Sequence, residues 1–264
     1  MKTFIFGANG MLGTYLHKYL IDSIPITRNE VDALIIQHSA FYSQLADLDI
    51  KKNDVIINAT GMINKRVAAP LDFMVVNAIF PRLLADYCEK RGIRLIHVTT
   101  DCVYDGEKGN YTEDDLAGDS SVYALSKSAG EPLNCTVIRA SIIGENKNNS
   151  KDLLEWVRTH HNMTISGWTN HIWNGITCLQ FAKVCEWVIE NNLFWNGVRH
   201  FYSPRAVSKA DLVEMINKIY DLGNTIERTT GTVDCDRTLS SVYSNDLVIP
   251  DLETQIIEQK NFGI

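Results

Sequence analysis

The chain has 264 residues, enough for one large domain or for a domain of about 150 residues with a smaller lobe. Its formal net charge of −7 argues against nucleic acid as the main partner, because phosphate backbones bind to basic surfaces. The six cysteines show neither C-x-x-C nor zinc-finger spacing, so we expect reduced thiols in a cytoplasmic protein without a metal site. No apolar run has the length of a membrane span, and we expect no membrane association.

Three glycines directly follow the first apolar segment. Lys2–Phe6 has the composition of a short buried strand, and Gly7–Gly13 then has the spacing G-x-x-G-x-x-G. Apolar residues recur at helical spacing from Met11 onward, so the glycines lie on a turn from strand to helix. The first turn of a helix offers unpaired N–H groups and the positive end of a dipole. This segment therefore predicts a binding site for the pyrophosphate of a nucleotide.

Short apolar strands alternate with amphipathic helices through the first 144 residues. The expected strands are Lys2–Phe6, Ile24–Ile26, Asp54–Asn58, Ile93–Val98 and Cys135–Arg139. Helices are expected over 70–91 and 123–131, whereas the segment after the second strand is either helix or loop. This order implies parallel crossovers, so the expected fold class is α/β, with a Rossmann-like doubly wound parallel sheet. We expect an NAD(P)-binding Rossmann domain over 1–145 and a substrate-binding lobe over 146–264, parts of which pack back on the first domain.

Four of the expected strands end in small or polar residues. These ends are Gly7–Gly13, Asn58–Gly61, Thr99–Asp101 and Arg139–Ser141. Ligands of doubly wound sheets bind beyond the carboxyl ends of the strands. Each segment alone is typical of an ordinary turn, but four at one edge favour a binding site.

A tyrosine and a lysine stand four residues apart in Tyr123–Lys127. On a helix they share a face, and the Lys127 ammonium is then expected to lower the pKa of the Tyr123 phenol from about 10 towards neutral pH. Such a tyrosine donates a proton to a ketone that accepts hydride, with the Thr100 hydroxyl holding the carbonyl. Tyr104 and Lys108 repeat the spacing, but the turn pair Asp105-Gly106 between them argues against a shared helical face.

These segments resemble the extended short-chain dehydrogenase/reductases, and within them the dTDP-4-dehydrorhamnose reductase branch of nucleotide-sugar enzymes. The resemblance covers residues 1 to about 144 in order. It rests on the glycine turn, the strand ends, Val76-Asn77-Ala78, Thr99 to Gly106, Tyr111 to Asp114, Tyr123 to Lys127 with Gly130-Glu131, and Val137 to Ser141.

The resemblance assigns roles to individual residues. Tyr123 is the general acid, Lys127 holds the nicotinamide ribose and lowers the tyrosine pKa, and Thr100 binds the substrate carbonyl. The residues expected to bind the cofactor are Gly7, Asn9, Gly10, Met11, Leu12, Arg28, Ala59, Thr60, Gly61, Asn77, Thr99, Tyr123 and Lys127. Asn77 has an alternative role as a buried amide that fixes the loop after its neighbouring strand.

The second lobe is expected to complete the substrate site. The expected substrate contacts are Thr100, Asp101, Ser141, Trp173 and Asn174. Trp168 and Trp173 are two tryptophans among small polar residues, which stack either on a base or sugar or on each other under a loop. Ser208 to Asp211 has the pattern of a helix cap.

Arg28 follows the second strand, where an arginine accepts the 2′-phosphate of NADP and an acidic residue holds the ribose of NAD. Arg28 therefore favours NADPH over NADH, and the nearby acidic residues Glu30 and Asp32 leave NAD as the alternative. Cys102 stands where dehydratases of the wider superfamily carry a glutamate, which argues against dehydration. Ile142 replaces a tryptophan that related reductases use to touch the sugar.

The resemblance implies an NAD(P)H-dependent reductase of the 4-keto group of a nucleotide-linked 6-deoxysugar, serving cell-surface polysaccharide synthesis. Two alternatives are an epimerase with tightly bound NAD and a non-catalytic regulatory subunit that binds nucleotide sugars. The expected partner is the nucleotide-sugar substrate, and a homodimer is an open alternative to a monomer.

Overall fold

The computed structural model describes residues 1–36, 38–63, 69–146, 152–244 and 246–264. Its centre is a six-stranded sheet in the order β10-β5-β4-β3-β1-β2, in which all neighbours are parallel. The strands are β1 (Thr3–Phe6), β2 (Ile24–Ile26), β3 (Val55–Asn58), β4 (Arg94–Thr99), β5 (Thr136–Arg139) and β10 (Gly197–His200). The strand order reverses between β1 and β3, which is where a doubly wound sheet binds its ligand.

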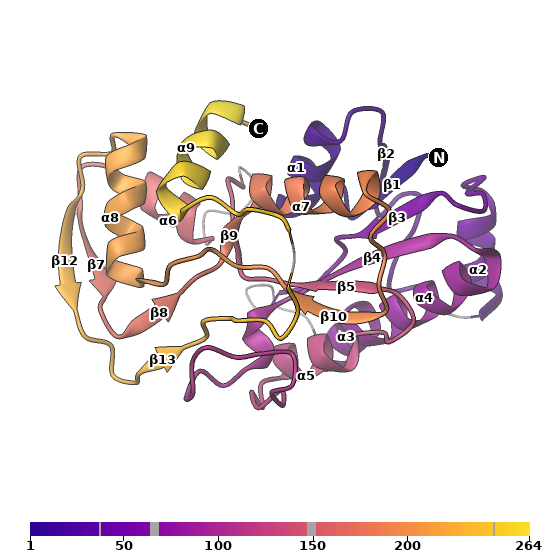
Figure 1. Cartoon of the computed structure of the whole chain (residues 1–264), viewed down its shortest axis with the longest axis horizontal. Helices are drawn as coiled ribbons and strands as arrows, with labels where there is room; N and C mark the ends of the chain where they lie inside the picture. Colours follow the sequence, from indigo (N-terminus) through magenta and orange to yellow (C-terminus); the bar gives the residue numbers. More distant parts are fainter. Residues whose placement is uncertain (37, 64–68, 147–151, 245) are drawn as a thin grey trace.

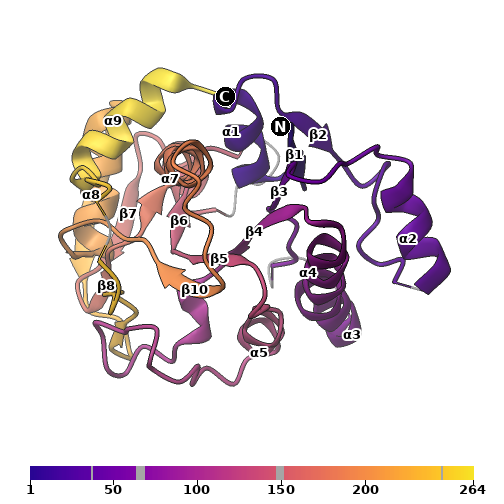
Figure 2. The same ribbon diagram turned by 45° about the vertical axis from the view of Figure 1, so that its right-hand side comes forward.

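Helices cover both faces of this sheet (Figures 1 and 2). One face carries α1 (Met11–Tyr19) and α7 (Cys178–Glu190). The other carries α2 (His38–Ala46), α3 (Pro70–Met74), α4 (Phe80–Arg91) and α5 (Val122–Ala129). The predicted Rossmann-like parallel sheet is confirmed.

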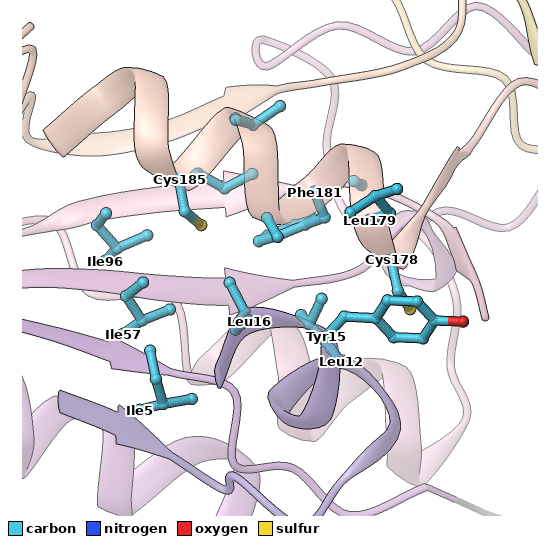
Figure 3. Packing of buried hydrophobic residues seen from close by; sticks show 14 of the residues in the cluster. Ile5, Leu12, Tyr15, Leu16, Ile57, Ile96, Cys178, Leu179, Phe181 and Cys185 are labelled. Carbon is cyan, nitrogen blue, oxygen red and sulfur yellow. The ribbon is translucent and has the colours of Figure 1, made fainter. Parts of the chain in front are cut away.

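Alternation along the strands explains the two layers. Ile5 of β1 packs with α1 and α7, whereas its neighbours Phe4 and Phe6 pack with α2 and α4 on the opposite face. Figure 3 shows Ile5, Ile57 and Ile96 pointing from three strands towards Leu16 of α1 and Cys185 of α7. Since both faces are buried, these strands have the continuous apolar sequences that made them predictable.

The segment 70–91 differs from a single helix. A π-helical stretch, η1 (Val75–Ile79), lies between α3 and α4 and contains the buried Asn77. Such π segments are frequent at functional sites. The ambiguous segment after β2 contains α2. Strand β10, which the C-terminal half of the chain adds to the edge of the central sheet, was not predicted.

A smaller lobe packs against the sheet domain (Figure 1). Its elements are β6 (Ile142–Ile143), α6 (Leu153–Thr159), β7 (Thr164–Trp168), β8 (His171–Trp173), β9 (Ile176–Thr177), β11 (Val207–Ser208), α8 (Lys209–Tyr220), β12 (Thr225–Thr229), β13 (Cys235–Asp236) and α9 (Leu252–Phe262). The predicted cap of α8 is confirmed, because Ser208 and Asp211 form a reciprocal capping box.

The lobe is not one continuous stretch of chain. Between its parts the chain returns to the sheet domain to form α7 and β10. The division of the chain at residue 145 stays a prediction, and residues 147–151 lie outside the described residues. All six cysteines are unpaired. Within the described ranges, no helix combines the length and apolar composition needed to cross a membrane.

Candidate active site

The glycine turn forms a backbone cradle at the start of α1. Gly7 has a φ of +77°, and a Cβ there would stand 2.9 Å from the Thr60 nitrogen of the neighbouring strand end. A Cβ on Gly13 would stand 2.1 Å from the Gly7 oxygen, so the turn closes only with glycine. Gly10 caps α1 without a side-chain hydrogen bond, which leaves the N–H groups of the first turn available. These backbone groups fit a pyrophosphate.

The other residues of the turn have different surroundings. Asn9 is exposed at the turn, Met11 is half-buried, and Leu12 packs into the core beneath α1. Leu12 therefore has only its backbone to offer a ligand, whereas Met11 also lines a cavity described below.

The loop after β3 is held by Asn77 of η1. Ala59 donates its backbone N–H to the Phe6 carbonyl, which joins this loop to β1. The Asn77 side chain accepts from the Met62 N–H at 2.8 Å and donates to the Met62 carbonyl at 2.9 Å and to the Ser126 hydroxyl at 3.1 Å. These contacts are those of the alternative role, an amide that fixes the strand-end loop. Gly61 lies within this held segment.

Gly130 brings α5 against the same residue. A Cβ on Gly130 would stand 1.7 Å from the Asn77 carbonyl oxygen, and no side chain fits there. Asn77 also bonds Ser126 of α5, so the loop after β3 and the helix that carries Tyr123 share one support. Thr60 is fixed from the other side, because its N–H donates to the Asn58 side chain at 3.1 Å.

Thr100 and Tyr123 meet at the carboxyl end of β4. Their hydroxyl groups lie close enough for the Thr100 hydroxyl to act on the pKa of Tyr123. Thr100 also donates to Asp101 at 3.1 Å and accepts from the Cys102 N–H, which fixes its side chain at the start of a short 3₁₀ turn (Asp101–Val103). The predicted carbonyl-binding hydroxyl and the predicted proton donor are thus brought together.

The pKa of Tyr123 departs from the sequence-based expectation. Burial raises it above its usual value, and the nearby Cys102 and Asp101 raise it further, while the Thr100 hydroxyl opposes them. Lys127 is not among the groups that act on it. The expectation that Lys127 lowers this pKa is therefore wrong for the ligand-free chain, because desolvation dominates. Tyr123 is protonated at neutral pH, which is the form that a proton donor requires.

Lys127 lies one helical turn after Tyr123 on α5 and is almost completely buried. Its Nζ donates to the Val98 carbonyl at 2.9 Å and lies 3.9 Å from the position that a Cβ on Gly61 would take. Burial lowers the pKa of Lys127 to about 8, and the carboxylate of Glu131 partly opposes this shift. Its position beside Gly61 suits a ribose at this strand end.

Thr99 does not face the same way as Thr100. Its hydroxyl donates to Glu131 at 2.8 Å on the opposite side of β4. Glu131 forms a buried ion pair with Arg139 of β5, and Arg139 also donates to the Tyr104 hydroxyl at 2.6 Å. The Thr99 side chain thus belongs to a buried network that fixes the ends of β4 and β5.

That network extends to the C-terminal half. His200 at the end of β10 lies 3.0 Å from Arg139 and donates its backbone N–H to Glu113 at 2.7 Å. Glu113 in turn accepts from Ser241 and from the Val242 N–H. Sequence reasoning missed this set, whose members are far apart along the chain and have no recognisable spacing.

Tyr104 and Lys108 behave as a chance repeat of the catalytic spacing. The Tyr104 hydroxyl donates to the Thr112 carbonyl, and Lys108 pairs with Asp115 at the surface. The prediction that these two side chains do not form a pair is confirmed.

Trp173 and Ser141 meet where the lobe covers the sheet edge. The Trp173 indole donates to the Ser141 hydroxyl at 2.7 Å, and Gly175 leaves room for the ring because a Cβ there would stand 2.2 Å from it. Together with Met11 and Lys209 they line a cavity of about 170 Å³. Lys209 was not predicted as a site residue.

Asn174 and Trp168 do not share this position. Asn174 uses both amide atoms on the backbone of Leu239, donating to its carbonyl and accepting from its N–H. Trp168 is about half exposed, and its ring packs at a tilted angle against His171 rather than on Trp173. Of the two tryptophans, only Trp173 faces the cavity.

Arg28 lies beyond β2, beside the glycine turn, which hydrogen-bonds to the end of that strand. Its side chain is 71% exposed and pairs with Asp32 at 3.2 Å. Glu30 turns back and accepts from the backbone and hydroxyl of Thr27. Arg28 is thus a surface cation at the place where the adenosine end of a dinucleotide lies in such sheets.

Comparison with known proteins agrees with the family resemblance seen in the sequence. The family model described as the RmlD substrate binding domain matches residues 1–236. A dTDP-4-dehydrorhamnose reductase of Aggregatibacter actinomycetemcomitans is 29% identical over 228 residues, which cover 80% of this chain and 76% of the relative. A dTDP-4-dehydrorhamnose reductase of Mycobacterium tuberculosis is 35% identical over 138 residues, which cover 48% of this chain and 43% of the relative.

Solved structures show the same fold. The crystal structure of a dTDP-4-dehydrorhamnose reductase from Bacillus anthracis in complex with NADP has a TM-score of 0.82 at 20% identity, over 98% of each chain. A dTDP-glucose 4,6-dehydratase of the same organism, in complex with NAD, has a TM-score of 0.71 at 17% identity, over 99% of this chain and 96% of that one. Because the family model spans most of the sequence, the chain belongs to the RmlD substrate binding domain family, within the extended short-chain dehydrogenase/reductases.

Proposed function

We propose that the chain is an NAD(P)H-dependent reductase of the 4-keto group of a nucleotide-linked 6-deoxysugar, as the names of its relatives suggest. The observation that carries this proposal is the pair of neighbouring hydroxyl groups, Thr100 and Tyr123, at the sheet edge that also holds the glycine turn. Hydroxyl groups in this arrangement suit a carbonyl oxygen. The backbone groups at the start of α1 suit the pyrophosphate.

The proposed chemistry divides between cofactor and protein. The reduced nicotinamide supplies a hydride to the carbonyl carbon when bound. Tyr123 donates its hydroxyl proton to the carbonyl oxygen, which yields the alcohol, and it regains a proton from solvent. Thr100 orients the same oxygen by turning its hydroxyl from Asp101 towards it. Lys127 holds the ribose hydroxyls beside Gly61.

The preference for NADPH rests on Arg28. An exposed ion pair such as Arg28–Asp32 is weak, so the guanidinium group of Arg28 is free to turn to a 2′-phosphate.

A cytoplasmic location is supported by the six free cysteines, and the cell-surface polysaccharide role follows the resemblance. The homodimer is a prediction that equilibrium sedimentation of the purified chain tests.

A direct assay tests the proposal. The purified chain is mixed with NADPH and with dTDP-4-keto-6-deoxyglucose, and the loss of reduced-nicotinamide absorbance is followed together with the product by mass spectrometry. Stoichiometric oxidation of NADPH with gain of two hydrogens by the sugar supports the reductase. Interconversion of sugar nucleotides without consumption of NADPH contradicts it and favours the epimerase alternative.

A further inference from the structure

Lys209 stands at the junction of the lobe and the sheet edge. It is the first residue of α8, directly after the cap residue Ser208. The antiparallel pairing of β11 with β8 sets Val207 opposite Trp173, so the start of α8 lies beside that ring. The capping box binds the N–H groups of Ser208 and Asp211, and the Lys209 side chain takes no part in it.

The ammonium group of Lys209 has no hydrogen-bond or ion-pair partner among the described residues. Its Nζ lies 4.8 Å from the centre of the Trp173 ring, which is a cation–π contact. By contrast, Lys218 on the same helix pairs with Glu253 at 2.9 Å. A half-buried ammonium with three donors and no acceptor is costly unless a ligand supplies oxygen atoms.

The group faces the predicted site. Lys209, Met11, Ser141 and Trp173 line the same cavity of about 170 Å³. Burial lowers the pKa of Lys209, the nearby Asp101, Cys102 and Cys235 oppose this shift, and Arg237 adds to it. Asp101 and Cys102 directly follow Thr100, so the ammonium lies near the proposed carbonyl site as well as near the glycine turn.

The cavity thus combines an unpaired donor group with an aromatic face. Ammonium groups bind phosphate oxygens and hydroxyl oxygens, and aromatic rings pack on the apolar face of sugars. A nucleotide sugar carries both kinds of oxygen within a few bonds of each other. Arg237, the other cation near this group, is already paired with Asp119 at 2.8 Å.

We propose that Lys209 is a substrate-binding residue whose ammonium group donates hydrogen bonds to oxygen atoms of the nucleotide sugar. This inference rests on the proposed function and adds the residue that holds the substrate from the lobe side. The oxygen atoms belong either to the diphosphate or to the hydroxyls of the sugar. A matched pair of ligands separates these two sources.

The test measures binding to the full chain loaded with NADP⁺, by titration calorimetry with dTDP-glucose and with dTDP. In Lys209→Met the dissociation constant for dTDP-glucose is expected to rise about tenfold to a hundredfold, the scale of a hydrogen bond to a charged group. Lys209→Arg restores part of the affinity. Lys218→Met, on the same helix but exposed, is the control and leaves binding unchanged.

The two ligands give separate outcomes. Equal weakening for dTDP and dTDP-glucose supports contact with the diphosphate, whereas weakening for dTDP-glucose alone supports contact with sugar hydroxyls. The affinity for NADPH and the melting temperature are expected to stay at wild-type values, and Lys209→Gln is the second variant should the methionine variant not fold. Unchanged binding of both ligands in a folded Lys209 variant overturns the inference. If the wild-type chain binds neither ligand, the proposed substrate class is wrong and the inference falls with it.

Discussion

Lys127 points its ammonium nitrogen at the carbonyl oxygen of Val98, 2.9 Å away, inside the sheet edge that holds the candidate site. Lys127 is only 6% exposed, and its burial lowers its pKa from 10.5 to about 8. The folded chain therefore carries a charge that its surroundings disfavour. The buried ammonium of Lys127 lowers the stability of the folded chain. A role in binding a ligand explains why the residue is a lysine all the same.

We expect Lys127→Met to stabilise the ligand-free chain at pH 7 and to abolish turnover. The pKa shift corresponds to roughly 3 kcal/mol, and loss of the hydrogen bond to Val98 offsets about 1 kcal/mol of it. Between pH 8 and 10.5 the unfolded chain binds more protons at Lys127 than the folded chain, so wild-type stability rises with pH there. The advantage of the variant is therefore full below pH 8 and shrinks above it.

Urea unfolding of both proteins across this pH range measures the difference. Lys90→Met, at an exposed position on α4, is the control and is expected to leave the free energy of unfolding nearly unchanged. A variant that is less stable than wild type at pH 7 contradicts the assignment of a disfavoured charge.

Tyr123→Phe is expected to lower kcat by roughly 10² to 10⁴, the usual scale for loss of a general acid. The ring remains, so packing and the dissociation constant of NADPH should change little. Steady-state kinetics with a 4-keto sugar nucleotide give the first quantity, and fluorescence titration gives the second. Tyr243→Phe removes a hydroxyl from a half-exposed ring and serves as the control. Near wild-type turnover in Tyr123→Phe would rule out its role as the acid.

Arg28→Ala is expected to raise the KM for NADPH and to leave the KM for NADH nearly unchanged. Only NADPH carries the 2′-phosphate that this exposed guanidinium group is placed to meet. Arg228→Ala removes another exposed arginine, bound to Asp211 and Glu214 on the lobe, and controls for the change in net charge. Equal effects of Arg28→Ala on both cofactors would reject the assignment.

We expect the chain to oxidise NAD(P)H with a ready-made 4-keto sugar nucleotide and to leave an unmodified nucleotide hexose unchanged. Dehydration needs a base at the position of Cys102, and burial together with the charge of Asp101 raises the pKa of that thiol to about 12. A neutral thiol does not replace a carboxylate as the base. Mass spectrometry after incubation with dTDP-glucose and NAD⁺ checks this, and formation of a 4-keto-6-deoxy product would favour a dehydratase.

The predictable parts of this molecule are those set by local spacing. The strands near Ile5 and Ile57 are continuous apolar runs because both of their faces are buried, and Gly7–Gly13 is fixed by contacts within one turn. Tyr123 and Lys127 share the α5 helix, and the helical pattern around them distinguished this pair from the chance repeat at Tyr104 and Lys108. Local spacing therefore predicted the strands and the glycine turn, and the family resemblance added the roles of Thr100 and Tyr123.

What the sequence did not reveal depends on contacts between distant segments. Strand β10 joins the sheet by pairing with β5, about 60 residues earlier, and nothing in its four residues indicates that partner. Asn174 lies in the loop that was expected to bind the substrate, but its side-chain amide hydrogen-bonds to the backbone of Leu239. The sequence alone did not mark Lys209 as a site residue, because its place beside Trp173 depends on the pairing of β11 with β8.

The contact between Gly130 and the carbonyl of Asn77 has a consequence for how specificity changes. Since α5, the π segment and the loop at Met62 are joined through these two residues, the side of the site that carries Tyr123 has no freedom to adapt to a larger or differently substituted sugar. The site can therefore make room for a different sugar only on its opposite side, which is formed by β8 and the start of α8. Variants selected for a new sugar are therefore expected to carry their substitutions around Trp173 and Lys209, with α5 unchanged.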